Sequence, residues 1–285
     1  MPELDIHGKK VKVPAGFGDS GLPNREYFSH SQFAMYQRCP RQYEYRHILG
    51  ITQPPGIAMT QGSVIHVGAE KTHRHTIEHG TPLPLAQAEA AVSDTFDRMK
   101  ENIEDWGDSK PDRIKDITLA HFRVYHAQST PLLRPKAVEE GFAVNVGTVP
   151  MVGFIDLIDE VMLDREKDVL TNGEGPLVTE VVADLKFTGR KWQATKLRND
   201  TQLTLYAHVK GIPRVRIDFL LDQKSGTRYV QERSLRTPRD AKNFEEDLEE
   251  VVHLIKKGIF PRCSPTDWVC TPRFCGYYER CRGPK

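Results

Sequence analysis

The spacing of apolar residues changes about halfway along the chain. From Ser29 to about residue 128, apolar residues recur every three or four positions, which is typical of helices that bury one face. Beyond about residue 137 they alternate with polar residues or form short continuous runs, as strands do. Helices followed by a mixture of strands and helices predict an α/β fold, in which a mixed central sheet is flanked by helices and the N-terminal part is helical.

The expected elements follow from this spacing. Helices are expected at 29–39, 40–49, 62–79, 84–106, 112–128, 198–211 and 238–258. Strands are expected at 137–146, 149–163, 176–187, 214–223 and 228–235, with a polar loop at 164–175. Residues 1–27 hold several Gly and Pro and show little periodicity, so an N-terminal arm is expected there, followed by a single domain over 28–285.

Local signals mark several helix ends. Ser29 or Ser31 can cap the first helix, and Pro40 ends that helix or opens the next. Gly211 is expected just after the helix at 198–211, and Pro238 in the first turn of the last helix.

Composition narrows the classes of protein. Of 285 residues, 38% are hydrophobic, which is enough for a core, and 40 Lys and Arg nearly balance 39 Asp and Glu. Any nucleic-acid surface must therefore be a local patch. No run is long enough to cross a bilayer and the N-terminus lacks the apolar centre of a secretory signal, so a cytoplasmic location is expected. Five cysteines without an export signal favour metal binding or free thiols over disulfides.

Charged residues interrupt two of the apolar strands. Asp184 and Lys186 in "VVADLKFTG" are two positions apart and therefore share a face, and Asp156 interrupts "GFIDLID". If the strands are neighbours, the two aspartates can share a divalent cation, with the backbone carbonyl of Leu185 as a further oxygen ligand. Such oxygen ligands suit Mg²⁺ or Mn²⁺ rather than zinc. The alternative is a structural Asp/Lys pair, because an Asp-x-Lys triplet is common by chance.

A combination of motifs bears on this choice. The stretches are "YQRCPRQYEYR", "GSVIH", "VGFIDLID", "VADLKFTG" and "DTQLTLYA". In this order they resemble the RecB-like branch of the PD-(D/E)xK nuclease superfamily. The resemblance implies a restriction-endonuclease-like fold and metal-dependent hydrolysis of phosphodiester bonds.

The resemblance also implies roles for individual residues. His66, Asp156, Asp184 and the Leu185 carbonyl would bind the catalytic metal. Lys186 would position the attacking water and steady phosphate charge, and Gln202 and Tyr206, four apart on one helix face, would organise the substrate backbone. Glu139 matches a further acidic position of the family, with Glu140 as its rival.

The C-terminal tail, "CSPTDWVCTPRFCGYYERC", is rich in cysteine, and a compact run of thiols on irregular backbone is typical of a metal centre. The resemblance to iron-sulfur members of the group implies a [4Fe-4S] cluster held by Cys39, Cys270, Cys275 and Cys281. Cys263 would be spare, or would replace one of them, because the spacing from Cys270 to Cys275 is unusually long. The cluster would close the tail, 263–285, onto the region of Cys39. A structural four-cysteine zinc site and free thiols remain alternatives.

A basic segment follows the predicted site. Its expected nucleic-acid-binding residues are Arg190, Lys191, Trp192, Lys196 and Arg198. Basic side chains reach phosphates and an aromatic ring can stack on an unpaired base, which favours single-stranded substrate. The alternative is a solvated loop with Trp192 packed inward.

These observations predict a metal-dependent deoxyribonuclease, an exonuclease acting on single-stranded DNA or DNA ends. Recombination, repair or CRISPR-type processing, with DNA-processing partner proteins, would be its setting. The alternative is a non-enzymatic nucleic-acid-binding protein with a structural four-cysteine zinc site. Cleavage of RNA or of particular nucleic-acid structures is a second alternative.

Overall fold

The computed structural model describes residues 3–6, 8–23, 26–163 and 178–283. The predicted polar loop at 164–175 lies outside these residues. The chain divides into two compact units, and each is described by itself. The first unit is Met1–Gln53, Gly141–Phe154 and Pro238–Lys285, and the second unit is Pro54–Glu140 and Ile155–Thr237.

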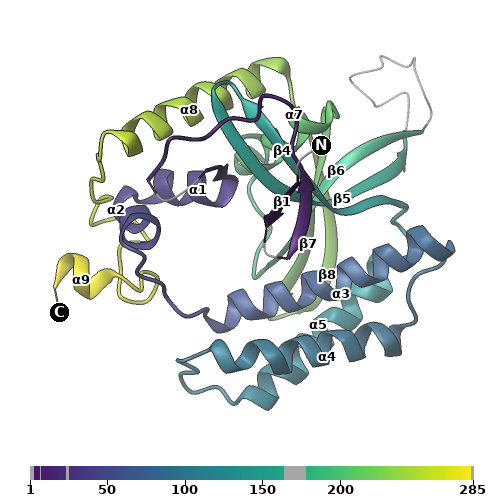
Figure 1. Cartoon of the computed structure of the whole chain (residues 1–285). Helices are drawn as coiled ribbons and strands as arrows, with labels where there is room; N and C mark the ends of the chain where they lie inside the picture. Colours follow the sequence, from purple (N-terminus) through teal and green to yellow (C-terminus); the bar gives the residue numbers. More distant parts are fainter. Residues whose placement is uncertain (1–2, 7, 24–25, 164–177, 284–285) are drawn as a thin grey trace. The chain divides into compact units, whose positions relative to one another are not determined.

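The order of the elements, helices first and then strands mixed with helices, follows the predicted order from residue 29 onward (Figure 1). The strands are β1 (Glu3–Ile6), β2 (Lys9–Lys12), β3 (Phe28–Ser29), β4 (Pro135–Val146), β5 (Val149–Met162), β6 (Val178–Thr188), β7 (Arg214–Gln223) and β8 (Gly226–Leu235). The helices are α1 (His30–Arg38), α2 (Pro40–Tyr43), α3 (Ile57–His79), α4 (Leu85–Met99), α5 (Pro111–Ser129), α6 (Ala194–Arg198), α7 (Thr201–Lys210), α8 (Pro238–Lys256) and α9 (Tyr278–Arg282).

The main sheet is mixed. Its hydrogen-bonded order is β3-β5-β6-β7-β8, with β4 paired to β5. β6 runs parallel to β7, whereas β5 and β8 run antiparallel to their neighbours β6 and β7. The expected class, a mixed central sheet with flanking helices, is therefore confirmed.

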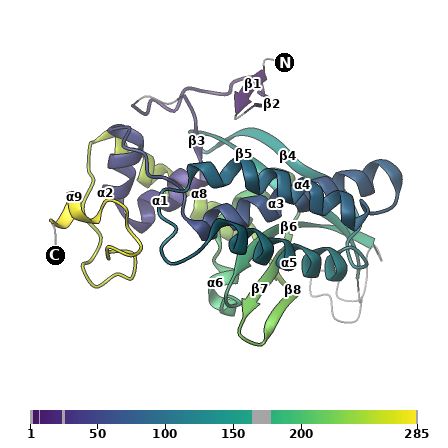
Figure 2. The same ribbon diagram turned by 90° about the horizontal axis from the view of Figure 1, so that it is seen from below.

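In the second unit, α3, α4 and α5 form a layer of helices (Figure 2). Their buried apolar faces meet Leu185 of β6, Leu220 of β7 and Tyr229 of β8 in one core cluster. Gly68 allows this packing, because a Cβ there would lie 2.5 Å from both Phe122 of α5 and a methyl group of Val92 on α4. The core thus fixes α3, and with it the side chains that α3 directs at the sheet.

Helix ends follow the predicted signals closely. Ser29 caps α1 through a capping box with Gln32, and Pro40 opens α2. Asp200 caps α7 by accepting a hydrogen bond from the Leu203 N–H, and Gly211 ends that helix with a left-handed φ of 67°. The cap predictions for Gly211 and for the first helix are confirmed.

The first unit departs from expectation at its N-terminus. Instead of an irregular lead-in, β1 and β2 pair antiparallel, with Ile6 opposite Lys9. The strands are too short for a clear period of two, but Gly8 has a φ of 79° and its N–H donates to Asp5 Oδ1 at 2.8 Å, which is turn chemistry. Ile6 and Val11 are buried in a small apolar cluster with Val152.

Three further differences are local. α3 begins at Ile57, one and a half turns before the expected start. α6 and α9 are single-turn helices, which are too short to show a helical period in the sequence.

No helix in the described part of the chain combines the length and the apolar character that a membrane span requires.

Candidate active site

Elements of the second unit bring the predicted catalytic residues together. These are His66 on α3, Glu139 on β4, Asp156 on β5, Asp184, Leu185 and Lys186 on β6, and Gln202 and Tyr206 on α7. β5 and β6 are antiparallel neighbours, with Leu157 opposite Ala183. Asp156 directly precedes Leu157 and Asp184 directly follows Ala183, so both aspartates lie next to the same residue pair. The sequence condition for a shared site, that the two strands lie side by side, is met.

Three of these residues form a group with the spacing of metal ligands. His66, Glu139 and Asp156 each offer one ligand atom, and these atoms all lie within 4.8 Å of one another. Glu139 has a φ of 49°, the left-handed region, which costs a residue with a Cβ about 1–2 kcal/mol. Strain of this kind persists where the surrounding structure holds a side chain in place.

His66 makes contacts on both ring nitrogens. Nε2 lies 2.9 Å from the Leu185 carbonyl oxygen, and because a carbonyl can only accept, Nε2 carries a proton in this contact. Nδ1 lies 3.4 Å from Asp156 Oδ2, and that oxygen also accepts a hydrogen bond from the Leu185 N–H at 3.2 Å. His66 Nδ1 and Asp156 Oδ2 therefore face each other as two candidate ligand atoms for a cation.

A chain of polar contacts leads from β6 to α7. Lys186 Nζ lies 2.7 Å from Asp184 Oδ2 and donates to Gln202 Oε1 at 3.1 Å. Gln202 Nε2 in turn donates to the Tyr206 hydroxyl at 2.8 Å. The lysine is thus held at two points, and Gln202 is held by Tyr206.

Burial shapes the protonation of these groups. Burial, together with the Asp184 carboxylate, raises the pKa of Asp156 to about 7. Burial also raises the pKa of Asp184, against the opposing attraction of Lys186. For Lys186, burial alone would lower the pKa, but the attraction of Asp184 and its hydrogen bond outweigh it, and the pKa is raised. Lys186 is therefore an ammonium at neutral pH, beside two carboxylates that resist ionising together.

The donor set fits a divalent cation. Asp184 is only 1% exposed, and apart from its ion pair with Lys186 its Oδ2 has no hydrogen-bond partner among the described residues. Carboxylate, carbonyl and imidazole ligands together suit Mn²⁺ or Mg²⁺.

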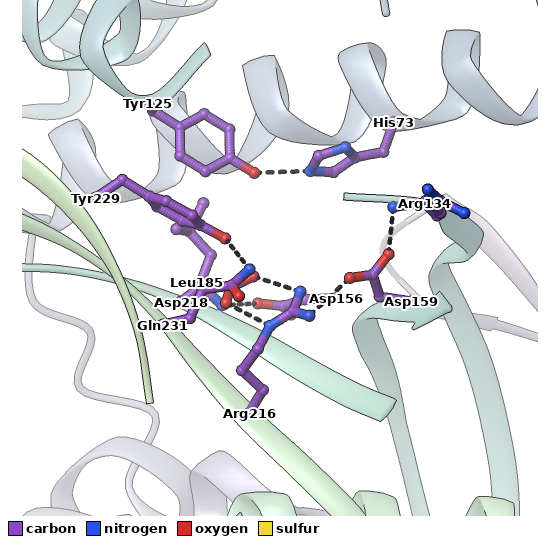
Figure 3. A network of polar contacts seen from close by, with 10 residues as sticks. All are labelled: His73, Tyr125, Arg134, Asp156, Asp159, Leu185, Arg216, Asp218, Tyr229 and Gln231. Atoms are coloured by element: carbon purple, nitrogen blue, oxygen red, sulfur yellow. Dashed lines mark hydrogen bonds and ion pairs between the residues drawn. The ribbon is translucent and has the colours of Figure 1, made fainter. Parts of the chain in front are cut away.

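A buried ion-pair network lies beside this group (Figure 3). Arg216 on β7 donates to both oxygens of Asp218, at 2.6 and 2.9 Å, and to Asp159 Oδ2 at 2.6 Å. The other Asp159 oxygen accepts from the Arg134 N–H at 2.6 Å. Asp218 lies opposite Leu185 in the sheet, and Asp159 follows Asp156 on β5, so the network joins the two strands that flank β6.

A pocket of about 310 Å³, counted with the solvent open to it, borders the same residues. Its lining includes His66, Glu139, Asp156 and, deeper, His73. His73 Nε2 is hydrogen-bonded to the Tyr125 hydroxyl at 2.7 Å, and burial lowers the pKa of His73 to about 4. His73 is therefore neutral at physiological pH and adds no charge to the carboxylate group.

The basic segment after β6 already has intramolecular partners. Trp192 meets Phe219 edge to face with ring centroids 5.7 Å apart, and Lys196 Nζ lies 4.0 Å from the centre of the Trp192 ring. Lys191 pairs with Glu232 at 2.5 Å. Arg190 and Arg198 are exposed.

All five cysteines line one pocket of the first unit, also of about 310 Å³. Cys263 lies among the others, and burial and hydrogen bonds to Cys39 and Cys270 raise the pKa of its thiol to about 12. Cys275 Sγ accepts from Gln42 Nε2 at 3.1 Å. None of the five forms a disulfide. A pocket walled by thiols fits an iron-sulfur cluster or a zinc ion held by four cysteines.

Two features of the site are not predicted by the sequence. The first is the set of ion pairs that Arg216 forms with Asp159 and Asp218, although each of these charges interrupts an apolar strand as Asp184 does. The second is which of Glu139 and Glu140 occupies the further acidic position. In the structure Glu140 pairs with Lys210 Nζ at 2.6 Å, and Glu139 is the member near His66.

Comparison with known proteins places most of the chain within one family. The family described as the PD-(D/E)XK nuclease superfamily matches residues 27–282. No curated protein matches. Among solved structures, a candidate exonuclease from Eubacterium rectale is 12% identical with a TM-score of 0.49, covering 91% of this chain and 90% of its own. The protein SSO0001 is 15% identical with a TM-score of 0.35, covering 77% of this chain and 85% of its own.

Proposed function

Because the chain belongs to the PD-(D/E)XK nuclease superfamily, whose substrates are nucleic acids, we propose that it is a divalent-metal-dependent deoxyribonuclease of the RecB-like, iron-sulfur branch. Its proposed action is that of an exonuclease on single-stranded DNA or DNA ends. The observation that carries the proposal is the approach of His66, Glu139 and Asp156 to within 4.8 Å, beside the Asp184–Lys186 pair.

Mg²⁺ or Mn²⁺ would be held by His66, Asp156, Asp184 and the Leu185 carbonyl, with Glu139 as a further ligand. When bound, the cation lowers the pKa of a water molecule and neutralises charge that builds up on the phosphate. The pKa of Asp156, raised to about 7, supports this role, because a carboxylate that is costly to ionise alone gains most from a cation.

Lys186 supplies positive charge at the reacting phosphate. Its raised pKa keeps it protonated, so it donates hydrogen bonds to a phosphate oxygen or to the attacking water and does not take a proton from that water. Gln202 and Tyr206 act as positioning residues, because Gln202 fixes the direction of the ammonium group and Tyr206 fixes Gln202. Burial raises the pKa of Tyr206 well above its usual value, so its hydroxyl remains neutral.

The cluster we propose is [4Fe-4S], held by Cys39, Cys270, Cys275 and Cys281, with a structural role in tying the tail to the region of Cys39. The shared pocket of the cysteines supports it. Cys263, which contacts Cys39 and Cys270, is the candidate substitute for one of them.

DNA would be guided to the site by the basic segment after β6. Arg190 and Arg198 are exposed and can reach phosphates. Lys191, Trp192 and Lys196 have partners in the protein, so DNA would have to exchange contacts with Glu232 or share the Trp192 ring.

Cleavage of labelled single-stranded DNA with Mn²⁺ or Mg²⁺ tests the proposal. Asp184→Asn and Lys186→Ala should each lose at least about 100-fold in rate, because the first removes a charged metal ligand and the second removes the positive charge at the reacting phosphate. Lys136→Ala is the matched control, since Lys136 makes only a surface pair with Glu160 at 2.8 Å and should cleave normally.

Two results would contradict the proposal. Normal cleavage by both folded variants would overturn the site assignment. A colourless protein that binds DNA but never cuts it with either metal would favour the non-enzymatic, zinc-containing alternative. A labelled RNA of the same sequence distinguishes deoxyribonuclease from ribonuclease action.

A further inference from the structure

Two large aromatic side chains are exposed side by side in the tail of the first unit. Trp268 and Phe274 are 65% and 54% exposed, and their rings meet edge to face with centroids 5.5 Å apart. A single exposed aromatic is ordinary on a protein surface. Two in contact form a continuous apolar patch, and such patches mark interaction sites.

Hydrogen-bonded turns anchor both rings. Val269, next to Trp268, is buried, and its N–H donates to Asp267 Oδ1 at 3.0 Å. The Phe274 N–H donates to the Thr271 carbonyl at 3.1 Å. The backbone under the rings is thus held in place. A ligand that binds there therefore loses little affinity to the ordering of flexible backbone.

The surroundings of the ring pair are basic. The Arg273 guanidinium lies 5.4 Å from the centre of the Phe274 ring. Residues 262–282 hold four arginines against two acids, Asp267 and Glu279. The Asp267 carboxylate is itself engaged by the Val269 N–H. A ligand that complements this surface is anionic and carries flat apolar groups.

We propose that Trp268, Phe274 and Arg273 form a platform on which unpaired bases of single-stranded DNA stack. Every base has a face that can stack on an aromatic ring, and arginines reach the phosphates between bases. In a duplex the base faces are covered by their neighbours, so the platform favours single strands. The substrate class rests on the proposed function, but the binding is separable from cleavage.

Binding in EDTA, where no cleavage can occur, tests the platform. The full-length protein is purified under nitrogen and titrated into labelled oligothymidine and into a duplex of equal length. Trp268→Ala and Phe274→Ala should each weaken oligothymidine binding about 5- to 150-fold, the loss typical of one stacked base. Duplex affinity should change much less.

Two further variants separate stacking from folding. Trp268→Phe keeps an aromatic face and should retain oligothymidine affinity, while losing the part of the tryptophan fluorescence that DNA quenches. Leu132→Ala removes an apolar side chain that is 60% exposed in the second unit and should bind DNA normally. Unchanged melting temperatures show that the tail stays folded.

Oligothymidine affinity that is unchanged in both alanine variants would overturn the platform. So would alanine variants that bind DNA normally and only lose self-association in sedimentation, which would make the patch a contact between copies of the chain. Cleavage with Mn²⁺ is scored separately. Platform-dependent binding without any cleavage overturns the nuclease proposal alone, and cleavage with platform-independent binding overturns the platform alone.

Discussion

At the scale of single residues, Glu139 and Glu140 are neighbours in the sequence with different surroundings in the structure. Glu140 forms an ion pair with Lys210, whereas Glu139, at a φ of 49°, lies with His66 and Asp156. In a regular strand the two side chains would lie on opposite faces. The left-handed φ of Glu139 breaks this regularity at the residue whose carboxylate lies near His66 and Asp156.

Glu139→Gln should raise the metal concentration needed for half-maximal cleavage by about ten-fold or more, because an amide oxygen replaces a charged ligand. Activity at saturating Mn²⁺ should fall less. Glu140→Gln is the matched control, since it removes the same charge one residue away and only weakens a surface pair with Lys210. Metal titrations of cleavage measure both. Equal metal dependence in the two variants would show that Glu139 is not a ligand.

Sequence reasoning could name both glutamates but could not choose between them. Alternation along a strand predicts faces, and it assumes extended φ and ψ at every residue. A left-handed φ at a glutamate has no signal in the sequence, because such conformations are expected of Gly, Asn or Asp. The choice depends on what packs around β4.

At the scale of elements, the position of β6 depends on its neighbours β5 and β7. Arg216 of β7 joins Asp218, opposite Leu185, to Asp159, three residues after Asp156. The three charged side chains are almost wholly buried, so each is costly without the others. The two strands that flank β6 are thereby tied to each other by buried ion pairs.

Arg216→Met should destabilise the protein by about 3–5 kcal/mol, because two buried carboxylates lose their cation. Combining it with Asp159→Asn and Asp218→Asn should recover part of this loss, since no uncompensated charge then remains. Urea unfolding measures both. Lys191→Met, which breaks the surface pair with Glu232, should cost at most about 1 kcal/mol. A similarly small loss for Arg216→Met would show that the network does not stabilise the sheet.

The elements themselves were largely predictable, and the network was not. "RVRIDFLLDQ" predicts β7 correctly, but alternation places Arg216 and Asp218 on a polar face, whereas both faces of β7 are buried. A charge inside an apolar strand needs a partner, and this holds for Arg216 and Asp159 as it does for Asp184. Identifying the partners required the order of the strands.

At the scale of the whole molecule, the first unit is assembled from three separate stretches of the chain. Cys39 lies at the junction of α1 and α2, and its pocket is completed by cysteines of the C-terminal tail. Much of that tail has no regular secondary structure, so side-chain contacts and turns must hold it. A cluster bound to Cys39 and to the tail would close a loop of more than 200 residues, where cross-links restrict the unfolded chain most.

Cys39→Ser should therefore lose iron and visible absorbance and lower the melting temperature of the first unit, because the tail loses its tie to α1 and α2. Cys263→Ser is the matched control. It removes a thiol from the same pocket and should keep about four irons per chain, as a [4Fe-4S] cluster requires. Iron content, absorbance and thermal unfolding under nitrogen measure both variants.

Loss of the cluster in Cys263→Ser, with retention in Cys270→Ser, would show instead that Cys263 is the ligand and that Cys270 is the spare thiol. Retention of colour and melting temperature in Cys39→Ser would show that the tail is held by packing alone.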